Sequence, residues 1–151
     1  DDNLLPIIST EVQGKVLTIT GRKGFSSTNE VLLNITTHGL SRLLMTASGN
    51  VSLNKMHESM LEITLRGAVN LQANGQVGTL KVRLEGTGDM DLDRLQSDVA
   101  DVVLSGAGNA RIFATGTFSG LLQGSGNIWV RGNPQMLRSN VYGAGRILPV
   151  R

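Results

Sequence analysis

The chain has 151 residues, of which 40% are apolar, so it is long enough to bury a core and is not a disordered chain. Its 14 basic and 12 acidic residues are mixed along the sequence, without the Lys/Arg cluster and interleaved aromatic residues that typify nucleic-acid binding. The lack of cysteine excludes disulfides and thiol chemistry, and no apolar run approaches the roughly 18 residues that suggest a membrane span.

The first part of the chain, residues 1–41, contains two segments that alternate as strands do. They read KVLTIT at 15–20 and EVLLNIT at 30–36, with a glycine- and serine-rich loop between them. Terminal units of a repeat protein are atypical, so we expect residues 1–41 to form irregular N-terminal coils that cap the rest. No linker separates them from residues 42–151, and the sequence predicts one domain over 1–151.

Residues 42–151 repeat every 18–20 residues. Each unit contains a short cluster of small residues, which we call the glycine knot, and a residue that follows it, which we call the anchor. Knots read, for example, SGAG at 105–108 and GSG at 124–126. The anchors are Asn50, Asn70, Asp89, Asn109, Asn127 and Arg146. A fixed period of this length is the signature of a solenoid.

Apolar residues stand at fixed places relative to the anchors. Five places before each anchor stand Met45, Leu65, Leu84, Leu104, Leu122 and Val141. The positions one and three places after it are also apolar, and they alternate with polar positions at the strand period of two. A sandwich would show hairpin turns about every 8–12 residues. We therefore predict an all-β fold, a single-stranded right-handed parallel β-helix of about seven coils, because parallel crossovers are right-handed.

The outward columns carry charges of alternating sign. Eight places before the anchors stand Arg42, Glu62, Lys81 and Asp101 in succession, and four places before them Arg66 is followed by Glu85. In stacked coils these charges lie on adjacent strands about 4.8 Å apart, where opposite signs are mildly favourable.

The knots are predicted to form the corners of the coils. Glycine adopts positive φ without strain, so Gly108 and Gly126 are expected either to hold positive φ or to stand at an over-tight corner. Asparagine side chains that stack from coil to coil form hydrogen-bonded ladders. We assign a structural role to nine knot and anchor residues: Gly49, Asn50, Asn70, Gly88, Asp89, Gly108, Asn109, Gly126 and Asn127.

Segments along essentially the whole chain resemble the bacterial head GIN domain family of auto-transporter adhesins. They are DDNLLPIISTEVQGKVLTITGRKG at 1–24, TASGNVSL at 46–53, LSGAGNARI at 104–112 and GSGNIWV at 124–130. The resemblance implies an extracytoplasmic β-solenoid, placed in the periplasm, on the outer-membrane surface or outside the cell, and it carries over no catalytic residue. The chain departs from the pattern at Val69 and Arg146, so we expect those two coils to turn differently.

Three carboxylates, Asp89, Asp91 and Asp93, would share a strand face, where oxygen ligands could hold Ca²⁺. Arg111 in the matching column of the next coil and Lys81 nearby lower the demand for a metal, so we expect no metal and no other cofactor. Asp91, Asp93 and Arg111 would also be the residues to suspect in a polysaccharide-active β-helix enzyme. Such an enzyme needs long loops between coils to build a cleft, and the coil lengths here vary by only two residues.

Apolar residues in the outward columns mark an interface candidate. The residues assigned to it are Trp129, Phe113, Leu121, Val103 and Leu148. The sequence thus predicts a non-enzymatic adhesion or binding module whose partner is a protein or a cell-surface glycan, and not nucleic acid. Self-association through a surface centred on Trp129 is a further expectation. A structural or assembly role in the cell envelope is the alternative.

Overall fold

The computed structural model describes residues 8–21 and 34–150. The chain divides into two compact units after Thr36. In the first unit, β1 (Ile8–Gln13) and β2 (Val16–Gly21) pair antiparallel as a hairpin, and Gly14 takes a φ of 60° in the connecting turn. The strand expected at 15–20 is therefore present, but it belongs to a hairpin and not to a solenoid coil. The capping role of residues 1–41 stays a prediction.

The other strand expected near the N-terminus falls largely on residues that the structure does not describe. Its described part, residues 34–36, is not in a strand. This segment precedes the repeats at 42–151, so the repeat pattern does not predict a neighbouring strand with which it would pair.

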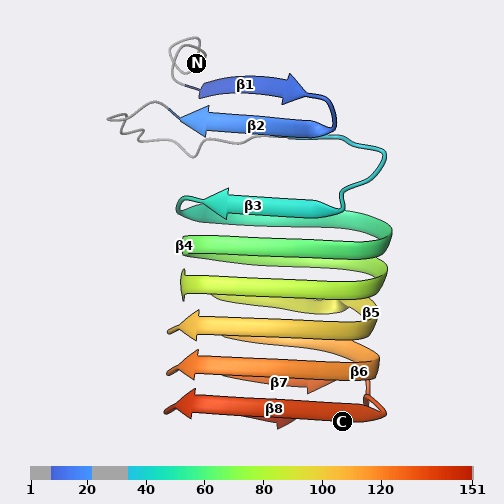
Figure 1. The fold of residues 1–151 in the computed structure, drawn as a ribbon, viewed down its shortest axis with the longest axis vertical. Helices are drawn as coiled ribbons and strands as arrows, with labels where there is room; N and C mark the ends of the chain where they lie inside the picture. Colours follow the sequence, from blue (N-terminus) through green and yellow to red (C-terminus); the bar gives the residue numbers. More distant parts are fainter. Residues whose placement is uncertain (1–7, 22–33, 151) are drawn as a thin grey trace. The chain divides into compact units, whose positions relative to one another are not determined.

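The second unit is a parallel β-solenoid of about six turns, close to the seven expected (Figure 1). Every strand pairing in it is parallel. The strands are β3 (Arg42–Thr46), β4 (Gly49–Thr87), β5 (Asp89–Gly106), β6 (Asn109–Gly124), β7 (Asn127–Arg131), β8 (Met136–Gly143) and β9 (Arg146–Pro149). In Figure 1 the chain runs leftward across the front and returns rightward behind while it descends, which is the sense of a right-handed coil.

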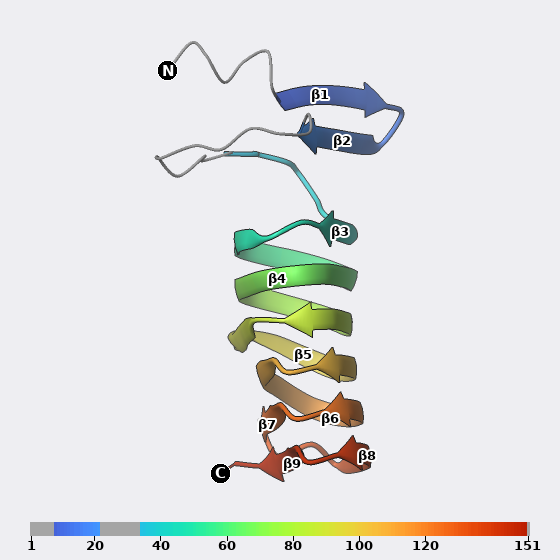
Figure 2. The same cartoon turned by 90° about the vertical axis from the view of Figure 1, so that its left-hand side faces the viewer.

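Each knot separates two walls of the solenoid. The leading wall contains the segments that run into the knots, from β3 through residues 99–106 and 117–124 to β8. The trailing wall contains the segments that follow the knots, including residues 89–92 and 109–113, β7 and β9. Figure 2 shows β8 on one side of the solenoid and β7 with β9 on the other. The outer faces of the two walls therefore look in different directions.

The core is built from the apolar columns that the repeat predicts. Leu104 lies opposite Leu84 on one side and Leu122 on the other, and all three are fully buried. Met45 opens the same row and is only partly buried, whereas Val141 in the last described coil is 41% exposed. Full burial of one such leucine stabilises the fold by about 1.5–3 kcal/mol, so these stacked rows hold the coils together.

In the knots at 105–108 and 124–126, the two glycines meet different demands. The first one takes positive φ, as in Gly106 at 137° and Gly124 at 146°. Gly108 and Gly126, the second ones, do not take positive φ, but a Cβ atom on either would collide with a backbone carbonyl oxygen of the coil before it. Of the two alternatives expected for Gly108 and Gly126, the structure shows the over-tight corner.

The two departures from the knot pattern have different consequences. Val69 stands where the later knots have their second glycine, and its side chain is fully buried in the core. Arg146 lies opposite Asn127 in parallel register, so the last coil keeps the pairing of the others. In the next coil Gly88 stands in the same column as Val69; it takes a φ of 125°, and a Cβ atom there would collide with the Val69 carbonyl oxygen.

The anchors form a ladder of hydrogen bonds along the corner. The Asn70 amide nitrogen donates to Asn50 Oδ1 at 3.0 Å, and the Asn109 amide nitrogen donates to Asp89 Oδ1 at 2.9 Å. The backbone N–H of Asn127 donates to Asn109 Oδ1 at 3.1 Å. A second, shorter ladder that the sequence analysis missed joins Asn74 Nδ2 to Asn54 Oδ1 at 2.7 Å. Side-chain amides paired in this way from coil to coil favour one register of neighbouring coils.

Candidate functional site on the trailing wall

One outward column crosses the trailing wall from strand to strand. Asp91, Arg111, Trp129 and Leu148 lie opposite one another in parallel register. The side chains of Asp91, Arg111 and Trp129 point outward, because the residues on either side of each in the strand are buried in the core, as Ile128 and Val130 are around the half-buried Trp129. The column places a carboxylate, a guanidinium, an indole and an aliphatic side chain on consecutive strands.

The guanidinium of Arg111 lies over the ring of Trp129. Its central carbon is 5.6 Å from the ring centroid, within the range of a cation–π contact. Among the described residues, Arg111 takes part in no ion pair. Its N–H groups therefore remain free to donate to a ligand on the outer surface.

A shallow hollow opens beside this pair. Its polar lining comes from two neighbouring coils, and Met90 and Ala110, whose side chains are buried in the core, also border it. The polar and aromatic residues that line it are Asp89, Asp91, Asn109, Arg111 and Trp129. Carboxylate and amide oxygens accept hydrogen bonds, the guanidinium donates them, and the indole offers an apolar surface. This combination suits a ligand that is both polar and partly apolar.

The three aspartates considered for Ca²⁺ have separate roles in the structure. Asp89 accepts the ladder bonds from Asn109, and Asp93 Oδ2 pairs with Arg131 Nη1 at 2.5 Å. Asp91 remains in the outward column. Within the part of the chain that the structure describes, no group of three or more His, Asp or Glu residues is arranged to hold a metal ion.

The five residues assigned to an interface do not form one patch. Trp129 and Leu148 are neighbours on the trailing wall. Phe113 lies at the far end of that wall opposite Arg131, where it lines a separate hollow. Val103 and Leu121 pair with each other on the leading wall. The knot between these columns turns the chain from the leading wall to the trailing wall. Val103 and Leu121 therefore lie on a different face from Trp129, although the sequence pattern assigns all three to outward columns.

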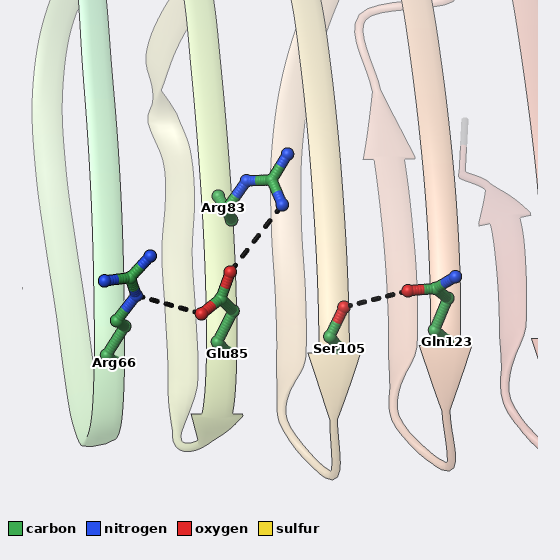
Figure 3. Close-up of polar contacts among 5 residues, drawn as sticks. All are labelled: Arg66, Arg83, Glu85, Ser105 and Gln123. Atoms are coloured by element: carbon green, nitrogen blue, oxygen red, sulfur yellow. Dashed lines mark hydrogen bonds and ion pairs between the residues drawn. The ribbon is translucent and has the colours of Figure 1, made fainter.

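The outer face of the leading wall carries a row of polar contacts, shown in Figure 3. Arg66 Nε lies 2.9 Å from Glu85 Oε2, Arg83 Nη1 lies 3.6 Å from Glu85 Oε1, and Ser105 Oγ donates to Gln123 at 3.2 Å. Arg42 and Glu62 form a second expected pair at 3.0 Å. Exposed pairs of this kind contribute little each, about 0–1 kcal/mol, and they satisfy one another across the strands. Lys81 and Asp101, two further charges of these outward columns, lie opposite each other in register and are exposed, and among the described residues neither forms an ion pair.

The sequence predicts that Trp129 points outward, but it does not connect this residue to the hollow. Asp91 and Arg111 were weighed only as metal or catalytic candidates, and Asp89 and Asn109 only as ladder residues. The signal was present in the column two places after the anchor, where Asp91, Arg111 and Trp129 follow one another.

Among the residues that the structure describes, no helix is long and apolar enough to cross a membrane.

Comparison with known proteins places the chain in a wider group. A family model described as "Putative auto-transporter adhesin, head GIN domain" matches residues 1–74 and again residues 41–134. The two matches overlap, as expected where one model meets a self-similar repeat. The chain is also similar to the crystal structure of a "putative adhesin" from Bacteroides fragilis, with a TM-score of 0.77 and 20% sequence identity. The similarity covers 99% of this chain and 79% of the other, and at this identity it concerns the fold. Among curated proteins, none matches the chain significantly.

Proposed function

The chain belongs to the head GIN domain family, and we propose that it acts outside the cytoplasm as a non-enzymatic adhesion module. It presents the outer face of its trailing wall to a cell-surface glycan or protein. The family description and the solenoid fold support an adhesive role, and the extracytoplasmic location follows from that role.

The observation that carries the proposal is the placement of Trp129 and Arg111. Tryptophan and arginine are the residue types that most often dominate binding energy in interfaces. Trp129 is the only tryptophan of the chain, and it lies half-buried on an outer face with Arg111 over its ring. Parallel strands that pair on both sides hold these side chains on a rigid surface, so little order has to be gained on binding.

The contacts and placement of the suspected catalytic residues support the proposal that the chain is not an enzyme. Of the three suspected residues, Asp93 is paired with Arg131 and Arg111 lies over Trp129. A glycosidase would need two carboxyl groups facing each other across a cleft that holds the sugar. The aspartates here follow one another along a strand, on the surface of a regular coil.

The test is binding of the purified chain to isolated cell-envelope fractions and to surface polysaccharide immobilised on a plate. We expect saturable binding that is reduced at least tenfold by Trp129→Ser. The matched control is Tyr142→Ser, which removes an aromatic side chain that is 66% exposed on the leading wall. Equal losses for the two variants, or no saturable binding to either material, would refute the assignment of the trailing wall.

A further inference from the structure

We propose that the hollow formed by Asp89, Asp91, Asn109, Arg111 and Trp129 is a subsite for one unit of a saccharide that carries no acidic group. The inference rests on the proposed function and names the ligand class of the same wall. Three properties of the hollow lead to it: an aromatic platform, hydrogen-bonding groups that the protein leaves unused, and the balance of charge.

The platform is the pair of Trp129 and Arg111. A sugar ring has an apolar face of C–H groups and a rim of hydroxyl groups, so it packs on a flat aromatic surface and hydrogen-bonds at its edge. The indole is held by its strand and by the guanidinium above it, at 5.6 Å from the ring centroid. Leu148, which is 37% exposed on the next strand, extends the apolar surface beside the ring. An amphipathic ligand matches this surface better than a wholly apolar one.

The rim of the platform offers both hydrogen-bond acceptors and hydrogen-bond donors. Asp91 forms no ion pair among the described residues, and its contact within the chain is a 3.4 Å bond from the Asp93 backbone N–H. Asp89 uses its Oδ1 atom for both ladder bonds from Asn109. Arg111 contributes donors. A hydroxyl group both donates and accepts, so neighbouring hydroxyls of a sugar can meet the carboxylates and the guanidinium together.

The balance of charge selects against acidic ligands. Two carboxylates and one guanidinium line the hollow, which leaves a formal excess of one negative charge. A uronate or sulfate group would face like charge directly, which costs binding energy. A saccharide without acidic groups avoids this cost and retains the hydrogen bonds.

The single tryptophan makes a direct test available, because tryptophan emission, excited at a wavelength that tyrosine does not absorb, reports on Trp129 alone. The purified chain is titrated with neutral hexasaccharides of glucose, mannose and N-acetylglucosamine, and with hexagalacturonate as the acidic counterpart. We expect at least one neutral hexasaccharide to change the emission saturably and to protect the indole from acrylamide quenching. The acidic hexasaccharide is expected to bind at least tenfold more weakly.

Two variants that each remove one charge test whether the saccharide binds in this hollow. Asp91→Asn and Arg111→Gln should each weaken binding at least fivefold without a change in the unfolding midpoint large enough to explain it. The matched controls are Glu85→Gln and Gln123→Ala on the leading wall, which should bind as the wild type does.

Failure of the inference can be told apart from failure of the proposed function. If no neutral hexasaccharide gives a saturable change, or if the acidic one binds best, the saccharide subsite is refuted. If envelope fractions still bind in a Trp129-dependent way, the adhesive role stands with a protein partner. If neither the saccharides nor the envelope fractions bind, both the saccharide subsite and the adhesive role are refuted.

Discussion

Arg111 and Trp129 lie opposite each other on adjacent parallel strands, with the guanidinium carbon 5.6 Å from the indole centroid. A contact of this kind at an exposed site contributes about 0.5–1 kcal/mol. We expect Arg111→Ala to lower the free energy of unfolding by that amount and to shift the emission of Trp129, because the ring gains solvent on one side. Arg94→Ala, which removes another exposed arginine, serves as the control in the same urea titration. An unchanged emission spectrum would contradict the stacked arrangement.

Gly108, the second glycine of its knot, leaves no room for a side chain. Gly108→Val should destabilise the chain by about 1–3 kcal/mol, because the added atoms overlap the Gly88 carbonyl and the Leu84 side chain of the preceding coil. The urea midpoint measures the effect. Ala107→Val, one position earlier on an exposed residue, is the matched control and should change the midpoint little. Equal effects of the two changes would show that close coil stacking is not the reason for the glycine.

Much of this corner could be predicted from the sequence, and part of it could not. The period places Leu84, Leu104 and Leu122 in one buried row, since any other register would expose them. The same period cannot tell which glycine of a knot takes positive φ, because both permit it. Only the stacked backbone shows that Gly106 has the positive φ and that Gly108 is required for close approach.

The candidate site shows the same limit. Alternation along a strand predicts that Trp129 and Val103 both point outward, and both do. It does not give the angle through which a knot turns the chain, so it could not predict that the two residues belong to different walls. The hairpin of β1 and β2 was missed for a related reason: the repeat pattern starts after it, and the first strand, ISTEVQ, has weak alternation.

The anchor ladder contains one weak step. Asp89 accepts hydrogen bonds from Asn109, but its carboxylate has no N–H group to donate to Asn70. Asn70 Oδ1 receives the Asp89 backbone N–H at 3.0 Å. Asp89→Asn supplies the missing donor, and we expect it to stabilise the chain by about 0.5–1.5 kcal/mol in thermal or urea unfolding.

The control for the ladder is Asp91→Asn, which makes the same chemical change two residues later in the outward column. It should leave the unfolding midpoint nearly unchanged at neutral pH. A gain of similar size in both variants would point to relief of negative charge and not to completion of the ladder.

Calcium should not stabilise the chain. Asp93 is paired with Arg131 and Asp89 Oδ1 accepts the ladder bonds from Asn109, and among the described residues no three carboxylates are arranged to share an ion. Melting in about 5 mM Ca²⁺, in the range of weak extracellular sites, should match melting with a chelator. A large upward shift that Asp91→Asn abolishes would show a metal site that the described geometry does not provide.

Self-association through Trp129 should be weak at most. Burying an aromatic side chain contributes about 1.5–3 kcal/mol, but Trp129 is already half-buried and partly covered by Arg111, so less surface remains to be gained. Val103 and Leu121 lie on the other wall and cannot add to the same contact. A stable interface buries about 800 Å² per partner, more than Trp129 and Leu148 supply together.

We therefore expect light scattering to show a monomer at micromolar concentration and a small rise in mass only at much higher concentration. Trp129→Ser should remove that rise, and Tyr142→Ser should not. A tight dimer that survives Trp129→Ser would place the contact elsewhere on the solenoid and leave the trailing wall free for its ligand.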